Sequence, residues 1–158
     1  MAKSKKIGFS PKVSQNVADF LSVLLADEFV LYLKTRNAHW NVEGPDFHMM
    51  HTYFEELYNE LATVIDEVAE RLRKIDHYAP ATMTEYLELT HLTEKRKGKN
   101  DSLSYISELL NDYDAIIAYI RGQLIALEDE IDQGTEDYAN ALAEQHEKTA
   151  WMLRAHLK

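Results

Sequence analysis

Apolar residues recurring at three- and four-residue steps restrict the fold of this chain more than any other feature. In the longest such run, between Leu103 and Ile131, the two steps alternate without interruption. The positions are Leu103, Ile106, Leu110, Tyr113, Ile117, Ile120, Leu124, Leu127 and Ile131. Because a helix turns by about 100° per residue, these side chains share one side of a long helix. The pattern is typical of helices packed in a bundle, and we place the end of this helix at Gly134.

Two further helices are predicted in the first half of the chain. The first runs from about Pro11 to about Ala38. The second opens at a candidate N-cap, Asp46, and runs to about Ile75. The glycine–proline pair at residues 44–45 separates them, because neither residue readily continues a helix. So short a connection makes the two helices antiparallel neighbours.

A long connection and a fourth helix complete the pattern. Residues 76–100 lose the periodicity, although the segment 85–89 predicts a short extra helical turn. The basic run at residues 95–99 is interpreted as a solvated turn rather than a nucleic-acid patch. A fourth helix follows Gly134, with one side made of Ala139, Leu142, Ala150, Leu153 and Leu157. The sequence therefore predicts an all-α, ferritin-like four-helix bundle, whose long crossover between helices two and three carries a short extra helix.

Composition limits the classes of function. With 158 residues and 46% apolar content, the chain suits one domain, and we assign residues 12–158 to the bundle and residues 1–11 to a mobile basic tail. The formal net charge of -10 favours cations and disfavours a general DNA-coating surface. The absence of cysteine leaves His, Asp and Glu as the plausible metal ligands. Neither a signal peptide nor a membrane span is indicated, so we expect a cytoplasmic protein without a membrane partner, nucleoid-associated if it binds DNA.

Candidate metal ligands lie on one face of the second helix. His51, Glu55, Asp66 and Glu70 share this face, because fifteen steps of about 100° return to within roughly 60° of the start. His51 and Asp66 are nevertheless about 22 Å apart along the helix, a gap that no metal ion bridges. A second copy packed antiparallel across a twofold axis would bring His51 opposite the partner's Asp66 and Glu70. We therefore predict an intersubunit site for iron, manganese or zinc.

Each candidate ligand also has an ordinary alternative. His39 lies near a helix end, where histidine often caps carbonyl groups. Asp66 and Glu70 have a spacing that is common on water-facing helices. His48 is interpreted as a surface residue rather than a ligand. The Glu-x-x-His unit at residues 88–91 would need a second helical copy to form a di-iron site within one chain, and the sequence has only this one, in the crossover.

A family resemblance supports the ligand assignment. The shared residues are Lys34-Thr35-Arg36-Asn37-Ala38-His39-Trp40-Asn41-Val42, Phe47, His51, Phe54-Glu55-Glu56, Tyr58, Asp66 and Ala69-Glu70-Arg71. This pattern, dense over residues 34–76, closely resembles the Dps family, the DNA-binding proteins from starved cells. The resemblance implies a hollow dodecamer with two irons per ferroxidase site at twofold interfaces. The implied ligands are His39, His51 and Glu55 from one subunit and Asp66 and Glu70 from its partner.

The resemblance also implies a function. It predicts a mini-ferritin that oxidises ferrous iron, preferentially with hydrogen peroxide, stores the ferric mineral and so limits oxidative damage. Trp40 would lie beside the centre, where family members use aromatic residues to intercept radicals. Family members line their iron-entry pores with carboxylates from the region of residues 128–137, and Asp132 and Asp137 are our choices here; a solvated helix end is the alternative.

Two other functions remain open on the sequence alone. A nucleoid protein that coats DNA without catalysis is disfavoured by the acidity of the chain and by its intact ligand set. The basic tail, with Lys3, Lys5, Lys6 and Lys12, predicts at most weak DNA binding through many tails on one cage. A structural oligomer held together by zinc or manganese would use the same ligands as the ferroxidase, because those metals compete for the same donors.

Overall fold

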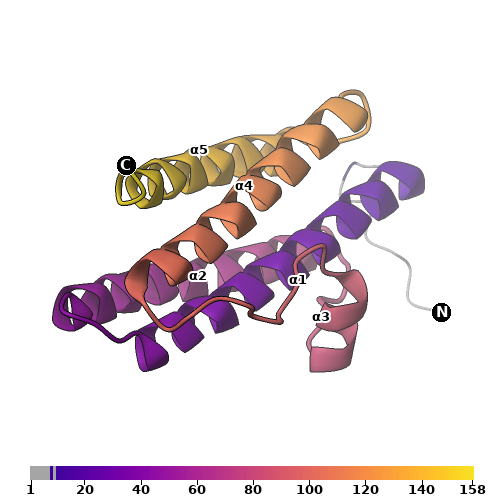
Figure 1. The fold of residues 1–158 in the computed structure, drawn as a ribbon. Helices are drawn as coiled ribbons and strands as arrows, with labels where there is room; N and C mark the ends of the chain where they lie inside the picture. Colours follow the sequence, from indigo (N-terminus) through magenta and orange to yellow (C-terminus); the bar gives the residue numbers. More distant parts are fainter. Residues whose placement is uncertain (1–7, 9) are drawn as a thin grey trace.

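The structure is a computed structural model that describes residue 8 and residues 10–158. Its five helices are α1 (Pro11–Asn41), α2 (Phe47–Lys74), α3 (Met83–Leu89), α4 (Ser102–Ala126) and α5 (Gln133–Ala155). Figure 1 shows α1 with α2 and α4 with α5 as two hairpins packed into a bundle, with the short α3 beside α1. The described residues form no strand beyond one isolated bridge between Glu43 and Asp101. The all-α fold and the extra helix in the crossover are therefore confirmed.

The first hairpin differs from its predicted bounds in one respect. The Ser10 side chain caps α1 by accepting a hydrogen bond from the Val13 N–H, as a helix-start signal should. The helix then continues three residues beyond its predicted end at Ala38, so that His39 lies within it. It stops just before Gly44, whose φ of +133° is open to glycine because it has no side chain. The helix thus carries His39 to the tip of the hairpin.

Asp46 precedes α2 as predicted, but its side chain makes no capping hydrogen bond there. Its Oδ2 instead accepts a hydrogen bond of 2.6 Å from the Ser102 hydroxyl, at the beginning of α4. The carboxylate therefore ties the tip of the first hairpin to the second hairpin.

The predicted role of Gly134 is wrong. This residue lies in the first turn of α5 and does not end the preceding helix. Asp132 starts α5 by accepting a hydrogen bond of 3.0 Å from the Thr135 N–H. A Cβ atom at Gly134 would lie 2.9 Å from an Arg71 guanidinium nitrogen, so this glycine permits the close approach of the Arg71 side chain.

The buried stripe of α4 includes the predicted positions Ile106, Leu110, Tyr113, Ile117 and Ile120, but it does not include Leu103. Leu103 was expected to be buried but is 54% exposed, and the helix ends at Ala126, before Leu127 and Ile131. Leu157, expected on the buried side of the last helix, lies beyond α5 and is 42% exposed. The bundle core nevertheless consists of apolar residues from all four long helices. Those from α4 are Tyr105, Ile106, Leu109, Leu110, Tyr113, Ile116, Ile117 and Ile120.

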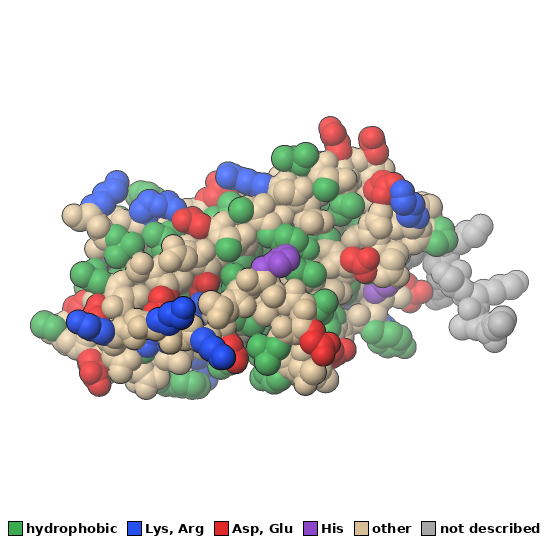
Figure 2. Space-filling view, turned by 45° about the vertical axis from the view of Figure 1, so that its right-hand side comes forward, with side chains coloured by type: hydrophobic (Ala, Val, Ile, Leu, Met, Phe, Trp, Pro, Cys, Tyr) green, Lys and Arg blue, Asp and Glu red, His purple; other side chains and the backbone are tan. Residues whose placement is uncertain are grey.

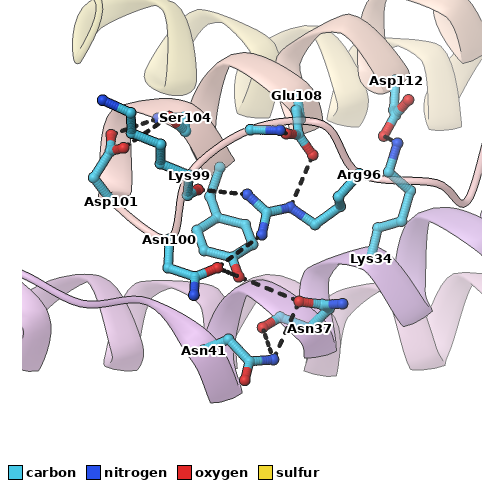
Figure 3. A network of polar contacts seen from close by, with 12 residues as sticks. Lys34, Asn37, Asn41, Arg96, Lys99, Asn100, Asp101, Ser104, Glu108 and Asp112 are labelled. Carbon is cyan, nitrogen blue, oxygen red and sulfur yellow. Dashed lines mark hydrogen bonds and ion pairs between the residues drawn. The ribbon is translucent and has the colours of Figure 1, made fainter.

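Arg96 fixes the crossover to the beginning of α4 (Figure 3). Its Nε donates to Glu108 at 3.0 Å, and its other nitrogens donate to the Lys99 carbonyl at 2.6 Å and the Asn100 side chain at 3.1 Å. The guanidinium also lies 3.5 Å from the centroid of the Tyr105 ring. The interpretation of residues 95–99 as a solvated turn is therefore wrong for Arg96, whose charge is paired and stacked, whereas the neighbouring lysines are exposed.

The same network reaches the half of α1 that carries His39. Asn37 on α1 accepts a hydrogen bond of 3.2 Å from the Tyr105 hydroxyl (Figure 3). The Glu43 N–H donates to the Asn100 carbonyl at 2.8 Å. Lys34 forms a buried ion pair with Asp112 of α4, and burial raises the pKa of that carboxyl group. The crossover and α4 therefore hold the end of α1 in place.

The surface carries charges of both signs. Figure 2 shows acidic side chains at the upper right, the end of the molecule where the turn between α4 and α5 lies. No described helix is both long and apolar enough to cross a membrane. The predicted basic tail falls mostly on residues 1–7 and 9, which lie outside the described residues.

We predict that Arg96→Ala lowers the free energy of unfolding by about 1–3 kcal/mol, because it removes the part-buried ion pair with Glu108 and the contact of the guanidinium with the Tyr105 ring. Lys97→Ala is the matched control; this neighbouring side chain is exposed, and we expect a change within about 0.5 kcal/mol. Thermal unfolding of both variants checks the comparison. Equal melting temperatures for the two variants would contradict the role assigned to Arg96.

Candidate metal centre

Two histidines at the tip of the first hairpin hold each other in place. The Nδ1 atom of His39 on α1 lies 2.7 Å from the His51 carbonyl oxygen, and the Nδ1 atom of His51 on α2 lies 2.7 Å from the His39 carbonyl oxygen. Their rings stack with centroids 3.7 Å apart, and His39 is only 8% exposed. Because a carbonyl can only accept, each Nδ1 must carry the hydrogen. In the neutral rings both Nε2 atoms are therefore left with a lone pair for a metal ion.

The ends of the helices explain why these bonds form. The helical partner of the His39 carbonyl would be the Glu43 N–H, but that group donates to Asn100 in the crossover. The His39 carbonyl is thus one of the unpaired carbonyls at the end of α1, and His51 satisfies it. Val42 and Met50, which lie between the two histidines in the sequence, are both buried. Folding of the hairpin therefore sets the orientation of both imidazoles.

Glu55 and Tyr58 extend this group along α2. Glu55 lies one turn after His51 and is exposed. The Tyr58 hydroxyl donates to Glu55 Oε1 at 3.2 Å, and the Tyr58 ring lies edge-on to His39 with centroids 5.2 Å apart. Burial, followed by the hydrogen bond to Glu55, raises the pKa of Tyr58. The structure thus brings His39 and His51 together, and Tyr58, which sequence reasoning had used only as part of a motif, contacts both His39 and the third predicted ligand, Glu55.

Trp40, predicted to act beside the centre, is 59% exposed. Its ring lies 5.1 Å from the Cζ atom of Arg36, which also lies 4.3 Å from the Tyr58 ring centroid and 5.6 Å from that of Tyr32. Arg36 therefore connects Trp40 to the aromatic side chains around His39. A catalytic role for Trp40 stays a prediction.

The second half of the predicted ligand set lies on the exposed surface of α2. Glu70 forms an exposed ion pair with Lys74 at 3.5 Å, and Asp66 has no hydrogen bond or ion pair with any other described residue. Within residue 8 and residues 10–158, no three His, Asp or Glu side chains come together as a metal site. A complete site from these residues would need donors from another molecule. The assignment of the five ligands stays a prediction.

The remaining histidine candidates have different surroundings. His48 is exposed, and its backbone carbonyl accepts a hydrogen bond of 3.0 Å from the Thr52 hydroxyl. His91, in the Glu-x-x-His unit, is bound to the fully buried Asp27, which accepts from its N–H at 2.7 Å and lies 3.3 Å from its Nδ1. His91 thus anchors the crossover to α1.

The two predicted pore residues also differ. Asp132 is buried, where it pairs with Arg71 and caps α5 through Thr135. Asp137 is exposed on the first turns of α5. Asp137 is therefore available to an incoming cation, whereas the charge of Asp132 is already paired. The pore assignment stays a prediction for both.

Comparisons with known proteins cover almost the entire chain. Residues 18–158 match the model of the ferritin-like domain family. The chain is 37% identical to DNA protection during starvation protein 2 of Bacillus anthracis, over 92% of this chain and 99% of that protein. It is 35% identical to the DNA protection during starvation protein of Helicobacter pylori, over 88% of this chain and 96% of that protein.

A solved structure of similar fold is the Dps protein of Vibrio cholerae, described as a member of a broad superfamily of ferritin-like diiron-carboxylate proteins. It superposes with a TM-score of 0.92 at 32% identity, covering 100% of this chain and 98% of that chain.

We predict that His39→Gln and His51→Gln each weaken cobalt(II) binding at least about 10-fold, because each removes an imidazole ligand. His48→Gln, close by on α2 and exposed, is the control and should leave binding unchanged. Titration followed by the visible absorbance of bound cobalt needs no oxidant, so it reports binding alone. Equal cobalt(II) affinities for all three variants would contradict the assignment of His39 and His51 as metal ligands.

Proposed function

We propose, from the premise that this chain belongs to the Dps family of ferritin-like proteins, that it is a ferroxidase and iron-storage protein. In this proposal it oxidises ferrous iron, preferentially with hydrogen peroxide, at sites shared between subunits. The ferric product is stored inside a hollow dodecamer, and the cell is thereby protected from oxidative damage. The location proposed for this activity is the cytoplasm.

The reciprocal hydrogen bonds of His39 and His51 carry the proposal. They orient two imidazoles before any metal arrives, and Glu55 adds a carboxylate from the next turn of the helix. Nitrogen and carboxylate donors suit ferrous iron and leave open positions for an oxidant. The net charge of -10 further favours the arrival of cations.

A second subunit is needed to complete the site in this account. The exposed Asp66 and Glu70 lie four and five helical turns beyond His51 on α2, and an antiparallel copy would bring them to it. Exposed apolar side chains on α1 and α3, including Leu33, Met83 and Leu87, surround a cavity of about 300 Å³. Such a surface supports burial against another copy.

Two ferrous ions at one centre would give the two electrons that reduce hydrogen peroxide to hydroxide. Neither electron would then leave as a hydroxyl radical, so oxidation and protection would be one process. The ferric ions need an enclosed acidic surface on which to form a mineral, and a single bundle of this size encloses none. Assembly is therefore part of the proposed function.

DNA binding is a weaker proposal for this chain. The relatives from Bacillus anthracis and Helicobacter pylori are named for DNA protection. Here the basic residues that would bind DNA lie within residues 1–12, and the overall acidity limits binding to low salt.

The proposal predicts rapid formation of ferric product when the anaerobic protein, loaded with two ferrous ions per site, receives hydrogen peroxide. His51→Gln and Asp66→Asn should both slow the rise of ferric absorbance and increase trapped hydroxyl radical, since each removes a ligand. Glu144→Gln, which changes an exposed acid on α5, is the control and should behave as wild type.

Wild-type rates in both ligand variants would contradict the ligand assignment. Zinc or manganese binding with no peroxide-dependent oxidation in the wild type would instead support a structural oligomer, because those metals occupy the same donors.

A further inference from the structure

The Asn100 carbonyl lies where the crossover meets the tip of the first hairpin. It accepts a hydrogen bond of 2.8 Å from the Glu43 N–H, and the two segments form an isolated parallel bridge here. The backbone of Val42 is extended, with a ψ of 137°, so α1 ends just before it. If the helix continued, the Glu43 N–H would donate to the His39 carbonyl, four residues back. Asn100 therefore decides which of two acceptors this N–H group uses.

The choice of acceptor bears on the orientation of His51. With the Glu43 N–H bound to the crossover, the His39 carbonyl accepts from His51 Nδ1 at 2.7 Å. Because Nδ1 carries the hydrogen of this bond, Nε2 is the ring nitrogen left for a metal ion. Extension of α1 through Glu43 would give the same carbonyl a competing donor, and it would change the path of the short connection that leads to α2. The crossover thus takes part in a contact made between α1 and α2.

We propose that Asn100 is a positioning residue for the metal centre. It fixes the end of α1, so that His51 keeps its bond to the His39 carbonyl and presents Nε2 to the metal ion. This inference rests on the proposed function and deepens it, because it names a residue that controls metal affinity without touching the metal. Coupling between sites is reciprocal, so the crossover becomes more rigid when a metal ion is bound.

The side chain of Asn100 provides the rigidity that this role requires. Its Oδ1 atom accepts hydrogen bonds of 3.1 Å from Arg96 Nη1 and from the Tyr105 hydroxyl (Figure 3). Tyr105 is only 1% exposed, so these bonds tie Asn100 to the core of the bundle. At the next residue, Asp101 caps α4 by accepting from the Ser104 N–H at 2.9 Å. The Asn100 carbonyl is therefore held from both sides.

Tyr105 also links this network to α1. Its hydroxyl donates to Asn37 Oδ1 at 3.2 Å, two residues before His39. One buried hydroxyl thus bridges the end of α1 and the crossover at Asn100. Loss of the Asn100 side chain would break the bridge but leave the ion pair of Arg96 with Glu108, so the crossover would stay attached to α4.

The first test is cobalt(II) binding by the purified full-length proteins, followed by visible absorbance. We expect Asn100→Ala to weaken binding about 10-fold, because a partner that orients a ligand is lost. Asn100→Asp keeps an oxygen that accepts both hydrogen bonds, and its affinity should return to the wild-type value. Tyr105→Phe removes only the hydroxyl and should weaken binding in the same direction as Asn100→Ala.

Thr90→Val is the matched control at the other end of the crossover. The Thr90 hydroxyl donates to the buried Asp27 of α1 at 2.7 Å, so this variant also loosens the crossover. It leaves the bridge between Glu43 and Asn100 in place. We therefore expect its cobalt(II) affinity to equal that of the wild type.

The second test uses hydrogen exchange of the backbone amides at residues 96–101, read by mass spectrometry with and without cobalt(II). Cobalt(II) should slow this exchange in the wild type and in Asn100→Asp. The slowing should be lost in His51→Gln and reduced in Asn100→Ala. A residue that only stabilised the fold would change exchange equally in the presence and absence of the metal ion.

Three results would overturn the proposal while leaving the proposed function intact. The first is wild-type cobalt(II) affinity in both Asn100→Ala and Tyr105→Phe. The second is an equal loss of affinity in Thr90→Val, which would mean that any loosening of the crossover has this effect. The third is exchange at residues 96–101 of the wild type that does not respond to cobalt(II). Failure of the wild type to bind cobalt(II) and to oxidise iron would overturn the proposed function together with this inference.

Discussion

The pair of hydrogen bonds between His39 and His51 is the interaction on which the site depends. Each imidazole donates a hydrogen bond to a backbone carbonyl of the other helix, so folding of the hairpin also sets the orientation of the candidate ligands. The carbonyl of His39 is available because the crossover takes its usual helical partner, the Glu43 N–H. The Arg96 network that positions the crossover therefore acts on the candidate metal centre from outside it.

Helix length imposes the second constraint. A straight helix such as α2 cannot bring His51 and Asp66 to one metal ion, since about 22 Å of helix separates them. The chain instead presents two incomplete halves: His39 of α1 and His51 of α2 at the tip of the hairpin, and the exposed carboxylates of Asp66 and Glu70 further along α2. This division is what makes assembly a condition of activity in the proposed function.

Periodicity in the sequence was sufficient to predict the helices, the crossover and the all-α fold, because apolar spacing reports which side of a helix is buried. Errors arose where tertiary contacts override local signals. Gly134 does not end a helix but lies against the Arg71 guanidinium. Arg96 does not belong to a solvated turn, because its side chain donates a hydrogen bond to Glu108. Spacing and family resemblance were sufficient to propose candidate histidine and carboxylate ligands, and their assignment stays a prediction. Their backbone hydrogen bonds, and the link from Tyr58 to Glu55, depend on how two helices meet and have no signal in the sequence alone.

Subunit mixing tests the central claim, that each centre takes ligands from two copies, most directly. A His51→Gln chain is co-expressed with a chain carrying both Asp66→Asn and Glu70→Gln, and each is also prepared alone. If the sites are shared, an equal and random mixture restores about a quarter of them, because some interfaces pair the intact histidine of one chain with the intact carboxylates of the other. Our account predicts recovery of peroxide-dependent iron oxidation to about that fraction of the wild-type rate. A mixture no more active than the two separate variants would contradict it.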